Sequence, residues 1–61
     1  MFLKLHDKND NSIWINMDII KCIFWNRKTN LAEMYVFNDP NGFCFQVKET
    51  PDRILELMKN K

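Results

Sequence analysis

The sequence contains few of the residues from which metal and nucleotide sites are built. Its 61 residues include one glycine, Gly42, and one histidine, His6. A single glycine excludes a glycine-rich phosphate-binding loop, in which several glycines let the backbone approach the phosphates. Structural zinc needs four ligands at short paired spacings, whereas Cys22 and Cys44 stand twenty-two residues apart. No motif adds the orienting residue that a Cys-His nucleophile requires, so we expect no catalytic residue, no metal ligand and no cofactor.

The sequence also lacks the features of secreted and membrane proteins. Two cysteines allow one bridge, too few for a disulfide-built miniprotein, and both stand within apolar runs, so we expect reduced, buried thiols. No apolar stretch approaches the roughly 20 residues that span a bilayer. The first ten residues, MFLKLHDKND, become charged too early for a signal peptide. We therefore expect a soluble, cytoplasmic protein with no membrane partner. Eight asparagines and seven lysines suit the A/T-rich genome of a bacterium or phage.

An excess of charge of either sign is absent too. Nine basic and eight acidic residues give a formal net charge of +1, so long-range steering toward nucleic acid is not expected. The apolar content of 46% is ample for a folded core and argues against disorder. We expect one domain over residues 1–61. A chain this short buries only about 60% of the surface that its unfolded form exposes, which favours support from a partner.

Alternating apolar and polar residues are the main pattern present. They predict five strands, at about residues 1–7, 12–16, 19–26, 31–38 and 43–49. The third of these has apolar side chains on both faces, interrupted only by Lys21, which is typical of a central strand. Turn-forming residues separate the strands, and the segment DPNG before Phe43 favours a tight reversal because Asn-Gly adopts positive φ angles.

A helix is predicted at about residues 51–59. Thr50 is a capping residue, Pro51 suits the first helical position, and Asp52 stands at the positive end of the helix dipole. The apolar positions form a stripe that must cover a neighbouring element: Ile54, Leu55, Leu57 and Met58. We therefore predict an α+β fold, an antiparallel meander of five strands as an open sheet or small barrel, with the C-terminal helix packed on one face.

Two segments resemble a known family. They are INMDIIKCI, residues 15–23, and FQVKETPDRILELM, residues 45–58. Together they resemble the small FlbD-type proteins linked to flagellar and swarming motility, which share an Asn-x-acid-x-Ile element and a similar helix start. The loop NDPNGF departs from the shorter glycine-containing turn of that family. The resemblance implies a short strand-rich fold and a small accessory or regulatory role, and it supplies no catalytic residue.

The segment from Asp7 to Asp18 has oxygen-bearing side chains at the spacing of a calcium-binding EF-hand loop. Asp7, Asn9, Asn11 and Asp18 occupy positions one, three, five and twelve. However, Ser12 replaces the glycine of the sharp turn, an aspartate replaces the bidentate glutamate, and the flanking residues predict strands. We therefore interpret this segment as a polar hairpin turn.

Nucleic-acid binding is the alternative function. Aromatic side chains stack on bases and cations neutralise phosphates, and the strands and turns contain both kinds of residue: Lys4, His6, Trp14, Lys21, Trp25, Arg27, Lys28 and Lys48. Acidic residues are spread through the same region and balance the charge, so no basic stripe is evident. Several of the aromatic rings are also needed to fill the core.

Protein association is the favoured function. One short helix covers one face of a sheet, and the aromatic residues exceed what a single small core needs. An uncovered aromatic face or an unpaired edge strand favours a homodimer or a protein partner. The predicted partner-binding residues are Trp14, Trp25, Arg27, Lys28, Tyr35 and Phe37. Because adjacent strand residues point to opposite faces, one of Phe24 and Trp25 should lie under the helix and the other on the open face.

Overall fold

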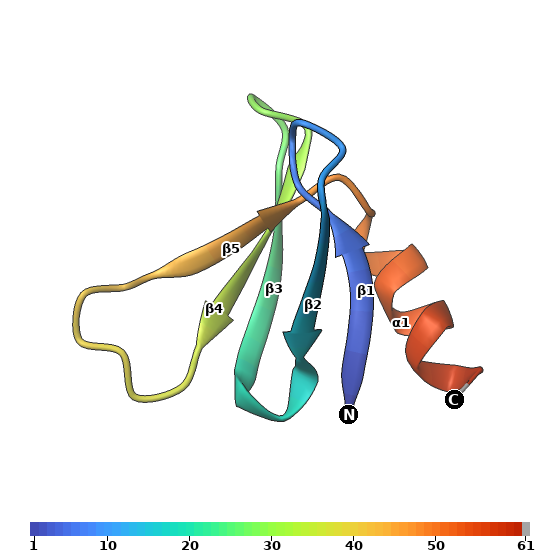
Figure 1. The fold of residues 1–61 in the computed structure, drawn as a ribbon. Coiled ribbons are helices and arrows are strands. Elements are labelled where there is room, and N and C mark those ends of the chain that lie inside the picture. Colours follow the sequence, from blue (N-terminus) through green and yellow to red (C-terminus); the bar gives the residue numbers. More distant parts are fainter. Residues whose placement is uncertain (61) are drawn as a thin grey trace.

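Residues 1–60, which the computed structural model describes, fold into two antiparallel sheets and one C-terminal helix (Figure 1). The first sheet pairs β1 (Phe2–His6) with β2 (Ser12–Asn16). The second has the order β3-β4-β5, formed by Ile20–Asn26, Leu31–Val36 and Cys44–Val47. Helix α1 spans Pro51–Lys59. The α+β class and the antiparallel pairing are therefore confirmed.

The prediction of one five-stranded meander is wrong at the step from β2 to β3. A short 3-10 helix, η1 (Met17–Ile19), follows β2 and lies between the predicted second and third strands, overlapping the expected start of the third. The Asn16 side chain caps η1 by accepting the Asp18 N–H at 3.1 Å. This turn ends the extended backbone, so β3 starts a second sheet instead of adding to the first. Over the described residues the two sheets do not close into a barrel.

The core lies between the two sheets and α1. Because side chains alternate across a strand, each sheet turns one set of apolar residues inward. The buried members are Leu3, Leu5, Ile15, Met17, Ala32, Met34, Val47 and Ile54. Full burial of one such aliphatic side chain contributes about 1.5–3 kcal/mol, so this small set accounts for much of the stability. Because each sheet has a face of apolar residues to bury, the strands pack as two layers and not as a single open sheet.

A β-bulge in β3 changes which of its residues face the core. Ile20 pairs with Val36 but Cys22 pairs with Tyr35, so the register shifts by one residue between them. Lys21 and Cys22 are consequently both exposed, while Ile20 on one side of the bulge packs against the core. The expectation of two buried thiols is therefore wrong for Cys22. Cys44 is half-buried, and within residues 1–60 both thiols are free.

Helix α1 occupies the range expected from its capping residues. Thr50 Oγ1 accepts the Arg53 N–H at 3.2 Å, and Pro51 stands in the first turn. Ile54 is fully buried, whereas Leu55 in the same predicted apolar stripe is 50% exposed. Only part of the predicted apolar stripe is therefore buried against the core.

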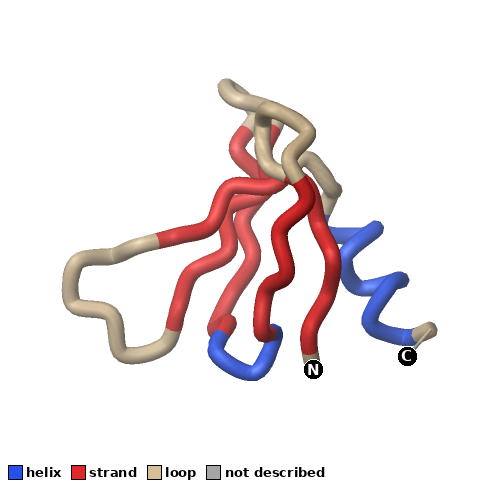
Figure 2. Tube along the Cα trace, viewed as in Figure 1, coloured by secondary structure: helices blue, strands red, loops and turns tan. Residues whose placement is uncertain are grey.

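The strands are shorter than predicted around the loop that joins β4 to β5. Figure 2 shows this loop, residues 37–43, extending away from the strands. Asn38 and Gly42 have φ angles of 59° and 67°, and the Gly42 N–H donates to the Asp39 carbonyl at 3.2 Å. The reversal is therefore a longer loop than a tight hairpin, and Phe37 and Phe43 lie outside the strands.

Candidate interaction site

The outer face of the β1–β2 hairpin carries two exposed aromatic rings. Leu3, Leu5 and Ile15 point into the core, so the alternate residues form an outer face made of Phe2, Lys4, His6, Ser12, Trp14 and Asn16. Trp14 is 62% exposed and Phe2 is 55% exposed. The register places Lys4 directly opposite Trp14, and Phe2 is therefore a diagonal neighbour of Trp14. This face combines a large apolar surface with polar neighbours.

The backbone hydrogen bonds of the hairpin show which groups point away from it. The Met17 N–H donates to the Met1 carbonyl at 2.7 Å, and the Asp7 N–H donates to the Asn11 carbonyl at 3.0 Å. In an antiparallel pair the bonded and non-bonded residue pairs alternate, so the odd-numbered residues bond across the hairpin. The backbone groups of the even-numbered residues consequently point outward, along the two edges of the sheet.

The two edges of the hairpin have different surroundings. On the β1 side, the His6 carbonyl accepts the Lys48 N–H at 2.8 Å and the His6 N–H donates to Glu49 Oε1 at 2.9 Å. On the other side, the outward backbone groups belong to Ser12, Trp14 and Asn16, which we call the β2 edge. Within residues 1–60 no backbone hydrogen bond joins the β2 edge to another strand.

Trp25 faces the core and Phe24 faces outward. Trp25 is half-buried and packs against the core cluster, whereas Phe24 is 55% exposed. Arg27 and Lys28 are exposed in the β3–β4 turn. Together with Asn26, these four residues line a shallow hollow at the end of β3. The predicted partner residues Trp25, Arg27 and Lys28 are thus brought together, with Phe24 as the exposed ring.

Tyr35 lies on the outer face of the second sheet, away from Trp14. Its hydroxyl donates to Glu33 Oε1 at 2.8 Å, and Asn26 Nδ2 donates to Glu33 Oε2 at 3.0 Å. These two hydrogen bonds lower the pKa of the Glu33 carboxyl. The hydrogen bond with Glu33, then burial and the charge of Glu33, raise the pKa of Tyr35 to about 12. Tyr35 is therefore a neutral donor engaged within its own sheet.

Cys22 and Cys44 flank Tyr35 on this outer face, in one row across the three strands. Burial, followed by the charge of Glu33, raises the pKa of the Cys44 thiol. A thiol with a raised pKa is a poor nucleophile, because the thiolate is the reactive form. Phe37, the remaining predicted partner residue, is 55% exposed in the β4–β5 loop. The predicted residues therefore divide between two sheets and a loop.

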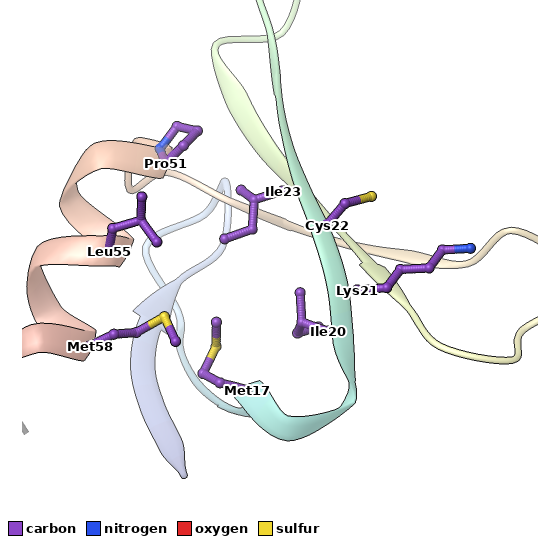
Figure 3. A pocket seen from close by; sticks show the side chains of 8 residues that line it. All are labelled: Met17, Ile20, Lys21, Cys22, Ile23, Pro51, Leu55 and Met58. Carbon is purple, nitrogen blue, oxygen red and sulfur yellow. The ribbon is translucent and has the colours of Figure 1, made fainter.

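A groove between α1 and β3 was not predicted from the sequence. It has a volume of about 340 Å³ and is lined by Met17, Ile20, Lys21, Cys22, Ile23, Pro51, Leu55 and Met58. Figure 3 shows the helix side chains Leu55 and Met58 facing Ile23 and Ile20, while Lys21 and Cys22 point away from the helix. One feature of the sequence pointed to this groove: the apolar stripe of α1 contains more side chains than the helix buries against the core.

The carboxylates of the turn between β1 and β2 are hydrogen-bonded to other groups of the protein. Asp7 Oδ1 accepts the N–H groups of Asn9 and Asn11, each at 2.9 Å. Lys48 Nζ lies 2.7 Å from Asp10 Oδ1, and this hydrogen bond lowers the pKa of the Asp10 carboxyl. In the described part of the chain, no three His, Cys, Asp or Glu residues gather as metal ligands would. The local bonding is that of a polar hairpin turn.

Comparison with known proteins gives no relative for this chain: no family model, no curated protein and no solved structure matches it. The resemblance to the FlbD-type proteins accordingly stays a prediction. Among residues 1–60, no helix combines the length and the apolar composition that crossing a membrane requires.

Proposed function

We propose that the protein is a small non-enzymatic interaction module that self-associates through the β1–β2 hairpin. The observation that carries this proposal is Trp14, a tryptophan 62% exposed beside an exposed Phe2. Tryptophan is among the residues most often found as interface anchors, because a large ring buries much apolar area in one contact. The polar side chains of Lys4, Ser12 and Asn16 surround the rings as the rim of an interface does.

The low stability expected of so short a chain supports the same proposal. A partner that binds the folded form stabilises it by mass action, so association would compensate for the small core. The resemblance to the FlbD-type proteins supports an accessory or regulatory role for such a module. We place it in the cytoplasm of a bacterium or in a phage-infected cell, as the composition suggests.

Sedimentation velocity over micromolar to millimolar concentrations tests self-association. The wild type should form a dimer or higher oligomer, and Trp14→Ser should shift the equilibrium toward monomer. Phe24→Ser is a matched control, because Phe24 is 55% exposed but lies on the other sheet, and this variant should associate like the wild type. A wild type that stays monomeric throughout the range would exclude the proposal.

Nucleic-acid binding is a second candidate, favoured by the hollow at the end of β3. There the exposed ring of Phe24 and the cations of Arg27 and Lys28 line one surface. Stacking and phosphate contacts need this combination of residues. Fluorescence anisotropy of labelled single- and double-stranded oligonucleotides should show binding that weakens with salt and is lost in an Arg27→Ala, Lys28→Ala variant. Absence of binding at low salt would remove this candidate.

A further inference from the structure

The strand edges of the two sheets differ in how open they are to a partner strand. β3 carries Lys21 and a bulge, and both features discourage pairing at an edge. Lys48, the residue after β5, donates its N–H to the carbonyl of His6 at the end of β1, so the ends of these two strands are in contact. The sequence of β2, SIWIN, has no charge and no proline, and its ladder with β1 runs without a register shift. The β2 edge is therefore well suited to strand addition.

We infer that a second copy of this chain pairs antiparallel with β2, with Trp14 on the two-fold axis, so that two hairpins form one four-stranded sheet. The inference rests on the proposed function and specifies its partner and its register. Identical strands that pair antiparallel form an isologous interface, in which residue i contacts j and j contacts i. The contact therefore closes at a dimer.

The backbone of the β2 edge is correctly oriented for this pairing. The N–H and C=O groups of Ser12, Trp14 and Asn16 point away from β1, and residues with outward groups exchange hydrogen bonds when two edges meet. With Trp14 on the axis, Trp14 bonds its own counterpart, and Ser12 bonds Asn16 of the second copy. The pairing leaves the hydrogen bonds between β1 and β2 intact.

The side chains of β2 match in the same register. Ser12 lies opposite Asn16, Ile13 opposite Ile15, and Trp14 opposite Trp14, so polar, aliphatic and aromatic positions each meet their own kind. A shift of one residue would put inward-facing isoleucines opposite outward-facing side chains. A shift of two residues keeps the faces but leaves part of this five-residue strand unpaired. The register centred on Trp14 is therefore the longest with matched faces.

Charges near the ends of β2 do not oppose the dimer. This register brings Asp10 of one copy toward Asp18 of the other, beyond the paired strands. Each carboxylate already has a cationic partner within its own chain: Asp10 Oδ1 is 2.7 Å from Lys48 Nζ, and Asp18 Oδ2 is 3.1 Å from the Met1 amine. On the outer face, the two Trp14 rings meet with Phe2 as a diagonal neighbour, which removes the most exposed rings of the hairpin from water.

Disulfide trapping tests the register. In a Cys22→Ser, Cys44→Ser background, a Ser12→Cys chain mixed with an Asn16→Cys chain should form a covalent dimer on mild oxidation. Directly paired residues have Cα atoms about 5.5 Å apart, which a disulfide spans. Ser12→Cys alone should not cross-link, because two Ser12 residues would lie about 13 Å apart along the strands. A nitroxide spin label on the Ser12→Cys variant alone measures the distance between the two Ser12 positions independently. This variant also retains Asn16, which caps η1.

A charge on the axis tests the same pairing by repulsion. Trp14→Lys should shift sedimentation to monomer, because it places two ammonium groups directly opposite each other. Phe24→Lys adds the same charge to the other sheet and should leave the dimer intact, and circular dichroism checks that both variants fold. A dimer that forms no Ser12–Asn16 cross-link, and whose spin labels do not show the expected distance between the two Ser12 positions, would overturn this inference but keep the proposed function. A wild type that is monomeric at every concentration would overturn both.

Discussion

His6 and Glu49 lie side by side where the two sheets meet, although 43 residues separate them in the sequence. His6 Nδ1 is 2.6 Å from Glu49 Oε2, and the His6 N–H donates to Glu49 Oε1 at 2.9 Å. One carboxylate thus receives both the ring and the backbone of the last residue of β1. This contact joins the first sheet to the segment that leads into α1.

The Glu49 contact should make the protein sensitive to acid. Burial raises the pKa of the Glu49 carboxyl, but hydrogen bonds from the His6 ring and backbone outweigh it, so the pKa lies below its ordinary value of 4.5. A carboxyl with a lowered folded-state pKa stabilises the protein above 4.5, and this contribution is lost as pH falls through the folded-state value. Glu49→Gln should lower the free energy of unfolding at neutral pH by about 1–3 kcal/mol.

Urea unfolding at neutral pH and at a series of pH values descending from 4.5 measures this effect. The difference between wild type and Glu49→Gln should shrink as the pH falls through the folded-state pKa, because the wild-type carboxyl is then protonated. Glu56→Gln is the control, since Glu56 is exposed and pairs with Arg53 within α1. A difference that is independent of pH would contradict the role assigned to the ionised carboxylate.

Ile54 should be the helix residue on which stability depends most. It is fully buried, and Ile54→Ala should destabilise the fold by about 2–5 kcal/mol through lost burial and a cavity. Leu55→Ala is the matched control, because Leu55 is 50% exposed and should cost much less. Thermal and urea unfolding followed by circular dichroism distinguish the two. Equal losses would mean that α1 docks through a different face.

Thr50 should contribute to stability through its hydroxyl as the cap of α1. Thr50→Ala removes the acceptor of the Arg53 N–H and should destabilise the protein by about 0.5–2 kcal/mol. Thr50→Ser retains the hydroxyl and should remain close to the wild type. If the alanine and serine variants had the same urea midpoint, the hydrogen bond would not be responsible.

Tyr35 should ionise at unusually high pH because of Glu33. Its hydroxyl donates to that carboxylate, and the pKa of Tyr35 is raised to about 12 from an ordinary 10.0. The raised pKa means that this contribution to stability is complete below 10.0 and is lost as pH rises through about 12. Tyr35 is the one tyrosine in the sequence, so tyrosinate absorbance reports on it alone. Glu33→Gln should move the titration toward 10.0, whereas an unchanged midpoint would mean that the carboxylate is not the cause.

Much of the local structure followed from the sequence alone. The helix from Pro51 to Lys59 was predictable because a capping threonine, a proline and an apolar stripe act within a few neighbouring residues. The antiparallel α+β class was predictable for a similar reason, since alternation and short turns are local patterns. The exposure of Trp14 agrees with the surplus of aromatic residues in a chain with a small core.

The tertiary structure decided how these elements are layered and which residues they expose. The division into two sheets depends on η1 and on the burial of both inner faces against each other, which no local pattern specifies. The bulge at Lys21 exposes Cys22, and packing against the core turns Trp25 inward and leaves Phe24 outside. The meeting of His6 with Glu49 and the openness of the β2 edge arise from the same packing. Alternation assigns neighbouring residues to opposite faces, but only the packed chain determines which face meets the core.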